Sequence, residues 1–358
     1  MKYIQTHTIA GVLLLLLSCT TDIEIRMKPT TPKLVLNASV GTGQELSAHL
    51  SRSWFITEQP VDEALDGATI RVFVNDQDKG RMQLVDDPAD TTTPRGQYRL
   101  PGCRLQTGDH LLLQAEATDL APVAAEMEMP ERTDILSVDT LWMGDSSYMG
   151  NLQLYVRFKD RANEPNYYRL VVRKETDYWK ADSLITTVAY GTSSEGASTN
   201  YLNHYYSGYN FTLFSYENFR VDYNDPVFLP QGGNNYPDKL ESYSCWGCFA
   251  DEQIDGQEYS LKSTMDYAAV SYKGDSVTSI VHYDVQLFSV TSSYYQYMKA
   301  MWRFALIGYG LEGLKEPLAA YTNIEGGYGV LSGYQISSRR FTMPFGSIPP
   351  AVTPFSKP

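Results

Sequence analysis

Short runs in which apolar and polar residues alternate make up most of the first third of the chain. In residues 68–75, Ile70, Val72 and Val74 alternate with side chains of other kinds, and a tight turn is expected at residues 76–80. Similar runs occupy residues 33–39, 46–53, 82–85, 96–100 and 110–117. Alternation with a period of two is typical of strands that bury one face, and glycine, aspartate and proline mark the turns between them. Residues 33–131 therefore predict an immunoglobulin-like β-sandwich.

The rest of the chain, residues 132–358, continues the strand pattern and adds one helix. Further strands are expected at residues 152–159, 167–174, 258–262 and 279–289, and a glycine-rich turn at 323–331 leads into a last strand. Tyr294, Tyr297 and Met301 recur at steps of three and four residues, which predicts a helix over residues 292–307. We therefore expect an all-β protein, in which the immunoglobulin-like β-sandwich precedes a larger β-rich domain, sandwich or barrel-like, that contains this helix.

A long polar and aromatic stretch, residues 190–237, has little periodicity of either kind. The chain holds 27 tyrosines, more than its 13 phenylalanines and 5 tryptophans together. Tyrosine and tryptophan are favoured at recognition surfaces because each offers a large rigid ring with a polar tip. Our candidate surface for a ligand or partner consists of Tyr201, His204, Tyr205, Tyr206, Tyr209 and Trp246. The alternative is that these rings only pack within half-buried strands and loops.

The N-terminus has the anatomy of an export signal. A short apolar run follows a lysine, and it falls below the roughly 20 residues that span a bilayer. The sequence Leu17-Ser18-Cys19, with further leucines upstream, resembles the lipobox of bacterial lipoproteins, in which the cysteine is acylated and becomes the first mature residue. We expect a signal peptide over residues 1–18, lipidation of Cys19 and a tether over residues 19–32, so that a lipid alone holds the protein on the membrane. The alternative is an ordinary secretory signal with an incidental cysteine.

Three more cysteines follow. Cys245 and Cys248 flank a tryptophan and a glycine, and in an oxidising compartment we expect this pair to form a short local disulfide. Cys103 is then left as a small buried side chain. One alternative for Cys-x-x-Cys is a thioredoxin-like redox site, but the βαβ pattern that it requires is missing. Another is half of a zinc site, but the histidines are scattered, and we expect no bound metal.

Charge and motif content exclude several classes of function. The net charge is −13, from 42 acidic and 29 basic residues, and no Lys/Arg-rich run occurs, which excludes nucleic acid as a partner. Residues 308–313 match the dinucleotide pattern G-x-G-x-x-G, but they follow the expected helix instead of opening one, so we interpret them as a loop. The acidic run at residues 86–90 offers calcium ligands, although a solvated loop is the simpler interpretation.

No motif of a known catalytic centre is present. The chain lacks H-E-x-x-H, G-x-S-x-G and a phosphate-binding lysine loop. A carboxylate pair of the glycosidase kind is defined by separation in space, and the sequence leaves it open. We therefore expect a protein that is not an enzyme, with no cofactor and no catalytic residue.

Three segments together carry a resemblance to a known family. They are residues 33–36 (Lys-Leu-Val-Leu) soon after Cys19, residues 50–53 leading to 66–70 (Asp-Gly-Ala-Thr-Ile), and residues 323–329 (Asn-Ile-Glu-Gly-Gly-Tyr-Gly). In that order they resemble domain of unknown function 4249, a family of Bacteroidota outer-membrane lipoproteins, over nearly the whole mature chain. Val330 and Leu331 depart from the family, which tends to carry a phenylalanine near this point. The acidic residues that follow Cys19 resemble the signal that sends such lipoproteins to the cell surface.

The resemblance implies a role but no catalytic residue. Members of the family are typically encoded beside TonB-dependent outer-membrane receptors, so the resemblance implies an accessory or ligand-capture lipoprotein on such a transporter. The starch-uptake lipoproteins that have this role are built from helical repeats, which this chain lacks. A free-standing structural or adhesive surface lipoprotein is the first alternative, and a surface hydrolase is the second. The sequence does not indicate the ligand.

Overall fold

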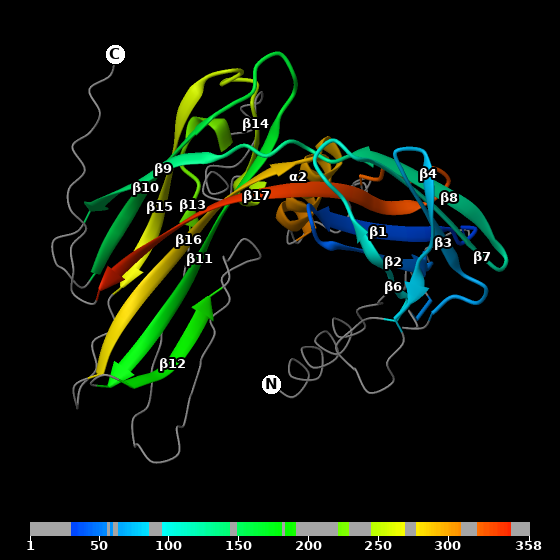
Figure 1. Ribbon diagram of the computed structural model, residues 1–358, viewed down its shortest axis with the longest axis horizontal. Helices are drawn as coiled ribbons and strands as arrows, with labels where there is room; N and C mark the ends of the chain where they lie inside the picture. Colours follow the sequence, from blue (N-terminus) through cyan, green and yellow to red (C-terminus); the bar gives the residue numbers. More distant parts are fainter. Residues whose placement is uncertain are drawn as a thin grey trace, which may run out of the picture.

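Two β-sandwiches follow one another along the long axis of the molecule in the computed structural model (Figure 1). The structure describes residues 30–55, 58–59, 64–85, 95–143, 149–180, 183–190, 221–228, 245–268, 277–308 and 321–344. Within these ranges the chain is mostly β-strand, with one α-helix and two short 3-10 turns. The expected all-β, sandwich-like class is confirmed.

The first sandwich, which we call the first lobe, is built mainly from the N-terminal part of the chain. Its strands are β1 (Leu34–Gly41), β2 (Glu45–Arg52), β3 (Thr69–Val74), β4 (Gln77–Arg81), β5 (Gln83–Leu84), β6 (Gln97–Arg104), β7 (His110–Ala117) and β8 (Leu120–Glu128). The strands β1-β2-β6-β5 pack against the sheet β4-β3-β7-β8. Leu36, Leu50 and Leu113 are fully buried between them, because alternate residues of each strand face the core.

The second sandwich, the second lobe, has a strongly aromatic core. Its elements are β9 (Ile135–Met143), β10 (Met149–Lys159), β11 (Tyr167–Lys180), β12 (Ser183–Tyr190), β13 (Val221–Asp222), η1 (Pro226–Phe228), η2 (Cys245–Gly247), β14 (Cys248–Ala250), β15 (Glu258–Ala268) and β16 (Val277–Val290). The sheet β13-β15-β10-β9 packs on β12-β11-β16, and β14 also pairs with β11. Phe158, Tyr168 and Phe249 meet in this core with ring centroids 5.3–6.1 Å apart.

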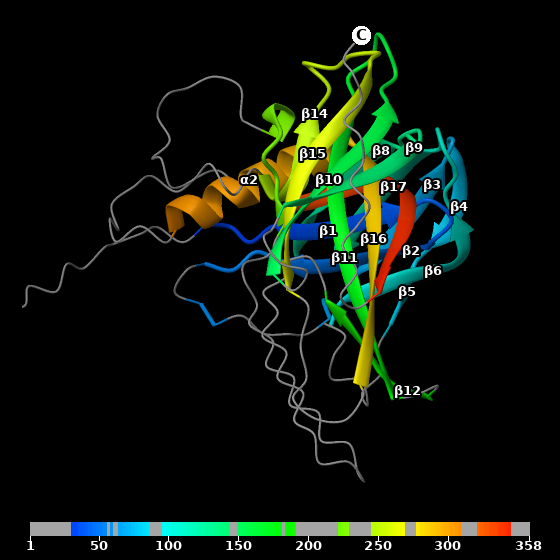
Figure 2. The ribbon, with the colours of Figure 1, turned by 90° about the vertical axis from the view of Figure 1, so that its left-hand side faces the viewer.

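The last strand, β17 (Tyr328–Pro344), belongs to both lobes. Its first part runs parallel to β1 and its second part antiparallel to β16. The strands β12-β11-β16-β17-β1-β2-β6-β5 therefore form one continuous sheet that serves both sandwiches (Figure 2). Residues 132–358 thus contain the second lobe together with a segment that enters the first.

The helix α2 (Ser292–Gly308) begins directly after β16 and confirms the helix expected at 292–307 to within one residue. The Thr291 hydroxyl caps it by accepting a hydrogen bond from the Tyr294 N–H at 3.3 Å. Tyr294 and Tyr295 pack on Val171 and Phe288, on the face of β11 and β16 that points away from the second-lobe core. Among the described residues, no helix is long and apolar enough to cross a membrane.

The structure corrects one turn and adds strands that the pattern did not predict. The turn expected at residues 76–80 lies instead at Asn75 and Asp76, whose φ angles are 51° and 62°, and β4 follows it at once. This strand was missed because it is an exposed edge strand without an apolar face. In β8 the buried Val123, Ala125 and Met127 alternate with more exposed side chains, so this added strand does follow the period of two.

Candidate functional site

The predicted aromatic surface falls only partly within the described residues. The members that lie outside them are Tyr201, His204, Tyr205, Tyr206 and Tyr209. Cys19 and the acidic run at 86–90 also lie outside. These assignments therefore stay predictions, and Trp246 is the member of the surface that the structure places.

Trp246 occupies a tight turn that is fixed to its surroundings. It has φ 50° and ψ 39°, and the next residue, Gly247, has φ 80°. A Cβ on Gly247 would lie 2.4 Å from the carbonyl oxygen of Leu170, so the close approach to β11 requires glycine here. The Trp246 carbonyl oxygen accepts a hydrogen bond from Arg169 Nε at 3.2 Å, and Arg169 also donates to the Tyr294 hydroxyl at 2.7 Å. The turn is thereby held between β11 and α2.

The Cys-x-x-Cys segment spans this turn. Cys248 opens β14 and its side chain is 2% exposed, while the side chain of Cys245 lies outside the described residues. Their disulfide stays a prediction. The segment leads into a strand rather than a helix N-terminus, which is not the setting of a thioredoxin-like redox centre. Cys103 is half-buried, and burial raises the pKa of its thiol.

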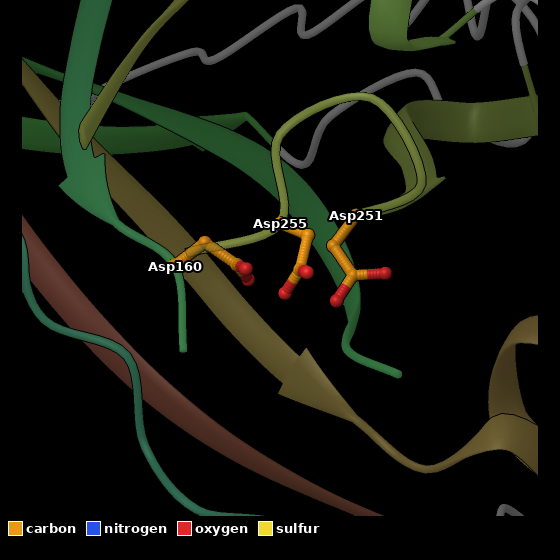
Figure 3. A group of neighbouring side chains, drawn as sticks. All are labelled: Asp160, Asp251 and Asp255. Atoms are coloured by element: carbon orange, nitrogen blue, oxygen red, sulfur yellow. The ribbon is translucent and has the colours of Figure 1, made fainter. Parts of the chain in front are cut away.

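Three carboxylates that the sequence did not single out lie together at one end of the second lobe. Asp160 follows β10, and Asp251 and Asp255 lie in the loop after β14 (Figure 3). Oxygen atoms of the three side chains lie within 4.8 Å of one another, and the side chains converge. Asp160 and Asp251 are only 3% and 6% exposed, whereas Asp255 is exposed. This cluster is the main concentration of buried charge in the described part of the second lobe.

Two donors hold Asp160 in its buried position. Its Oδ1 accepts a hydrogen bond from the Tyr168 hydroxyl at 2.5 Å, and its Oδ2 accepts one from the Gly256 N–H at 2.8 Å. Burial raises the pKa of the Asp160 carboxyl and the charge of Asp251 adds to this, while the bonds from Tyr168 and Gly256 oppose the rise. Burial and the bond to Asp160 also raise the pKa of the Tyr168 hydroxyl.

The other two carboxylates bind the preceding loop. Asp251 Oδ2 accepts hydrogen bonds from the Asn166 N–H at 2.7 Å and from its side-chain amide at 3.1 Å. Asp255 Oδ1 accepts one from the Asn163 N–H at 3.0 Å. The Asn166 amide also donates to the carbonyl oxygen of Arg161 at 2.9 Å. Residues 160–166 and 251–257 are therefore tied together through the carboxylates.

A set of carboxylate oxygens is the kind of ligand set that calcium prefers. In this cluster, however, each carboxylate already accepts hydrogen bonds from the neighbouring loop, and these bonds account for the burial of Asp160 and Asp251. We therefore interpret the cluster as a clamp between two loops. Its members come from loops about 90 residues apart in the sequence, so no local motif could have identified it.

A row of hydrogen-bonded side chains crosses four strands of the large sheet. Thr187 of β12 donates to Asp177 Oδ1 at 2.6 Å, and Asp177 Oδ2 lies 3.1 Å from His282 Nε2. On the other side of the ring, His282 Nδ1 lies 2.9 Å from the Thr342 hydroxyl. A hydroxyl, an imidazole and a carboxylate are also the groups that make up the catalytic triad of hydrolases.

The backbone N–H groups beside this row are not available to form an oxyanion hole. Acyl transfer also needs donors aimed at the developing oxyanion, most often backbone N–H groups. Asp177 lies on β11 and His282 on β16, and each strand is paired on both sides, so the ladder already uses the N–H groups beside them. The row is therefore a set of cross-strand contacts that stabilises the sheet.

A groove of about 620 Å³ lies at the junction of the two lobes. Its first-lobe side is lined by Glu126, Glu128 and Glu131. The second-lobe side is lined by Arg161 and Glu164 of the loop before β11 and by Tyr167 at the start of β11, and Tyr321 lies in the segment before β17. All four glutamates are exposed, and Arg161 and both tyrosines are half-buried. Burial and the neighbouring Tyr167 raise the pKa of the Tyr321 hydroxyl. The groove therefore combines negative charge with aromatic rings.

The groove is anchored to the carboxylate clamp. Arg161 donates to Glu164 Oε1 at 2.5 Å and to the Thr133 hydroxyl at 3.2 Å, and it also contacts Asn166. The ring of Tyr167 stacks on that of Tyr295 of α2, with centroids 5.1 Å apart. Elements of both lobes and the helix thus fix the walls of the groove.

Comparison with known proteins supports the resemblance seen in the sequence. The chain matches the family model described as Domain of unknown function (DUF4249) over residues 20–340. A search of curated proteins found no match. The matched region runs from before β1 to within β17 and so includes both lobes and the groove between them. The chain therefore belongs to the DUF4249 family.

Proposed function

We propose that this protein is a surface-exposed, lipid-anchored lipoprotein of a Bacteroidota outer membrane, where it acts as the accessory or ligand-capture subunit of a TonB-dependent transporter. The observation that carries the proposal is the groove between the lobes, whose walls come from both sandwiches and α2. Membership of the DUF4249 family and the lipobox at Cys19 support the location and the partner. No part of the proposal requires catalysis.

The predicted anchor leads straight into the first lobe. Fourteen residues, 20–33, separate Cys19 from β1, and fully extended they span at most about 50 Å. β1 lies inside the large sheet, between β17 and β2. A lipid on Cys19 would therefore hold the first lobe near the membrane, and the second lobe would be free to face a transporter or the medium.

The charges and rings that line the groove restrict the chemical kind of ligand or partner segment that can bind there. Four glutamates and one arginine line the groove, and Arg161 lies 2.5 Å from Glu164 and 3.7 Å from Glu131. The lining therefore keeps an excess of negative charge, mainly at Glu126 and Glu128, and the whole chain has a net charge of −13, so anionic groups are disfavoured. Tyr167 and Tyr321 offer ring faces and hydroxyls, which suit neutral polar or cationic groups.

Co-purification from the native membrane tests the proposal. Tagged, full-length protein is captured from detergent-solubilised outer membranes, and the eluate is identified by mass spectrometry. We expect a TonB-dependent receptor in about equal amount. A Tyr205→Ala/Tyr206→Ala variant should recover roughly tenfold less receptor, because buried aromatic anchors dominate interface energies. A Tyr155→Ala variant, changed at a half-buried tyrosine of β10, is the matched control and should behave like the wild type.

Recovery of the lipoprotein alone, under conditions that retain a known receptor complex, would contradict the proposal. That outcome would favour the free-standing structural or adhesive surface protein. The hydrolase alternative requires turnover on a glycan or peptide panel that is lost when one acidic side chain is changed.

A further inference from the structure

Among the described residues, the first strand, β1, pairs with the last, β17. β1 and β17 run parallel over seven residue pairs, from Val35 with Tyr328 to Gly41 with Tyr334. Parallel strands always require a long connection, and here the rest of the fold forms that connection. The first lobe therefore consists of residues 34–128 together with the first part of β17, which lies about 200 residues further along the chain.

Two glycines allow β17 to approach β1 closely. A Cβ on Gly329 would lie 2.1 Å from the carbonyl oxygen of Leu36, and a Cβ on Gly327 would lie 2.5 Å from that of Leu34. Gly329 also has a φ of +106°, which L side chains rarely adopt. These positions belong to the Asn-Ile-Glu-Gly-Gly-Tyr-Gly segment that carries the family resemblance. That motif therefore has a structural role in joining β17 to β1.

The residues just before β17 fasten it to the opposite sheet of the first lobe. The Asn323 side chain imitates a neighbouring strand, because it accepts a hydrogen bond from the Leu331 N–H at 2.9 Å and donates one to the Leu331 carbonyl oxygen at 2.8 Å. Glu325 exchanges backbone hydrogen bonds with Ala124 of β8 at 2.8 and 3.3 Å. The segment thus connects β1 in one sheet to β8 in the other.

The same segment completes the apolar core of the first lobe. Leu331 and Ile324 are 0% and 4% exposed, and they belong to the buried cluster that contains Leu34 and Leu113. Without residues 321–334, this core would be open to water and β1 would present an unpaired edge. The first lobe is incomplete without these residues.

β17 then continues into the second lobe without interruption. It pairs with β16 over eleven residue pairs, from Val290 with Tyr334 to Ile280 with Pro344, and Met343 is buried in the second-lobe core. The two ladders meet at Tyr334, so β17 has no unpaired segment between the lobes. Their stabilities are therefore coupled through a single strand.

We propose that residues 321–344 act as a closing strap: the first lobe is completed only when this segment docks, and the two lobes then close as one cooperative unit. A chain made and exported from its N-terminus cannot close its first lobe before residue 334 has emerged. The first lobe therefore stays incomplete until β17 has been made and can pair with β1. Pairing of such distant segments is slow, because loop-closure entropy is lost before the contacts form.

Pulse-labelling hydrogen exchange during refolding of the intact mature chain tests the strap directly. Amides of β1, β2, β3 and β7 should become protected in the same kinetic phase as those of β17 in residues 328–334. The wild-type chain is used, so the result does not depend on whether a variant folds. Protection of the first-lobe strands in an earlier phase than β17 would overturn the proposal.

A pair of glycine variants gives a second, equilibrium test. Gly329→Val places a β-branched side chain at a positive φ and makes it clash with β1. The variant should lower the hydrogen-exchange protection of the β1 and β8 amides in the native state by about tenfold or more. Gly102→Val in β6 is the matched control, because its φ is +77° but no atom lies within 4 Å of the added Cβ. A loss of protection confined to β17, with β1 and β8 unchanged, would also overturn the proposal.

Discussion

Replacing Tyr168 by phenylalanine should weaken the clamp that joins the two loops of the second lobe. The ring is fully buried, and phenylalanine retains its apolar contacts, so the change removes only the hydroxyl. That hydroxyl donates to Asp160 Oδ1 at 2.5 Å and lies 3.3 Å from the Thr133 hydroxyl. A hydrogen bond to a charged group contributes about 1.5–3 kcal/mol, so we expect the free energy of unfolding at pH 7 to fall by about 2 kcal/mol. The melting temperature should fall by about 3 °C, because the entropy of unfolding of a cooperative unit of this size is roughly 0.65 kcal/mol/K.

The loss of stability in Tyr168→Phe should depend on pH, and the titration of Asp160 determines whether the loss grows or shrinks as the pH rises. Burial raises the pKa of this carboxyl in the folded state above its unfolded value of about 3.9. Asp160 therefore favours the folded state most below the unfolded pKa, and this contribution is lost as the pH rises through the folded pKa. The Tyr168 bond opposes that loss by stabilising the carboxylate. Tyr168→Phe should thus be least harmful near pH 4 and most harmful at pH 7.

Thermal and urea unfolding at pH 4, 5.5 and 7 measure this effect. Tyr223→Phe is the matched control, because the Tyr223 hydroxyl is also buried but donates to a neutral acceptor, the Leu170 carbonyl oxygen, at 3.1 Å. We expect this control to lose about 1 kcal/mol at every pH. Equal losses for the two variants at pH 7, or a Tyr168→Phe loss that does not change with pH, would refute the reasoning.

Further predictions concern the strap, the clamp and the cysteines. Leu331→Ala should lower the free energy of unfolding by about 2.7–5 kcal/mol in urea titrations, because Leu331 is fully buried, whereas Leu184→Ala at a side chain 50% exposed should change it by less than about 0.5 kcal/mol. Asp160→Asn should remove the part of the pH dependence of the free energy of unfolding that this carboxyl causes between pH 4 and 7. If the difference in free energy of unfolding between the variant and the wild type stays constant over that range, the assignment is contradicted. When the denatured, unreduced mature protein is alkylated, mass spectrometry should find the label on Cys103 alone. A label on Cys245 or Cys248 would show that their disulfide is absent.

The fold class followed from the sequence because strand periodicity is a local signal. Most strands of the first lobe and the helix α2 lie where alternation or helical spacing put them. The strands β4 and β8 of the first lobe were not predicted. The exposed edge strand β4 lacks the contrast between faces that the pattern needs, whereas in β8 the buried Val123, Ala125 and Met127 do alternate with more exposed side chains, so a signal is present there.

The joining of the two lobes was not predictable from local patterns. Residues 323–331 were expected to be a turn into a last strand, but nothing in them indicates that the strand pairs with β1 at the other end of the chain. The Asp160 cluster and the groove were missed for a similar reason, because each is assembled from loops distant in sequence. Conversely, the Tyr-rich residues that the sequence emphasised lie outside the described residues, so their role stays a prediction.

The measurement that tests the central claim most directly is crosslinking on intact cells. A membrane-impermeant, lysine-reactive reagent is applied to cells that carry the tagged, lipidated chain, and the crosslinked products are purified and identified. The proposed function leads us to expect a TonB-dependent receptor as the main covalent partner, which would establish both surface exposure and partnership. Crosslinks only between copies of this chain, or none in cells where external protease still cleaves it, would contradict the accessory role.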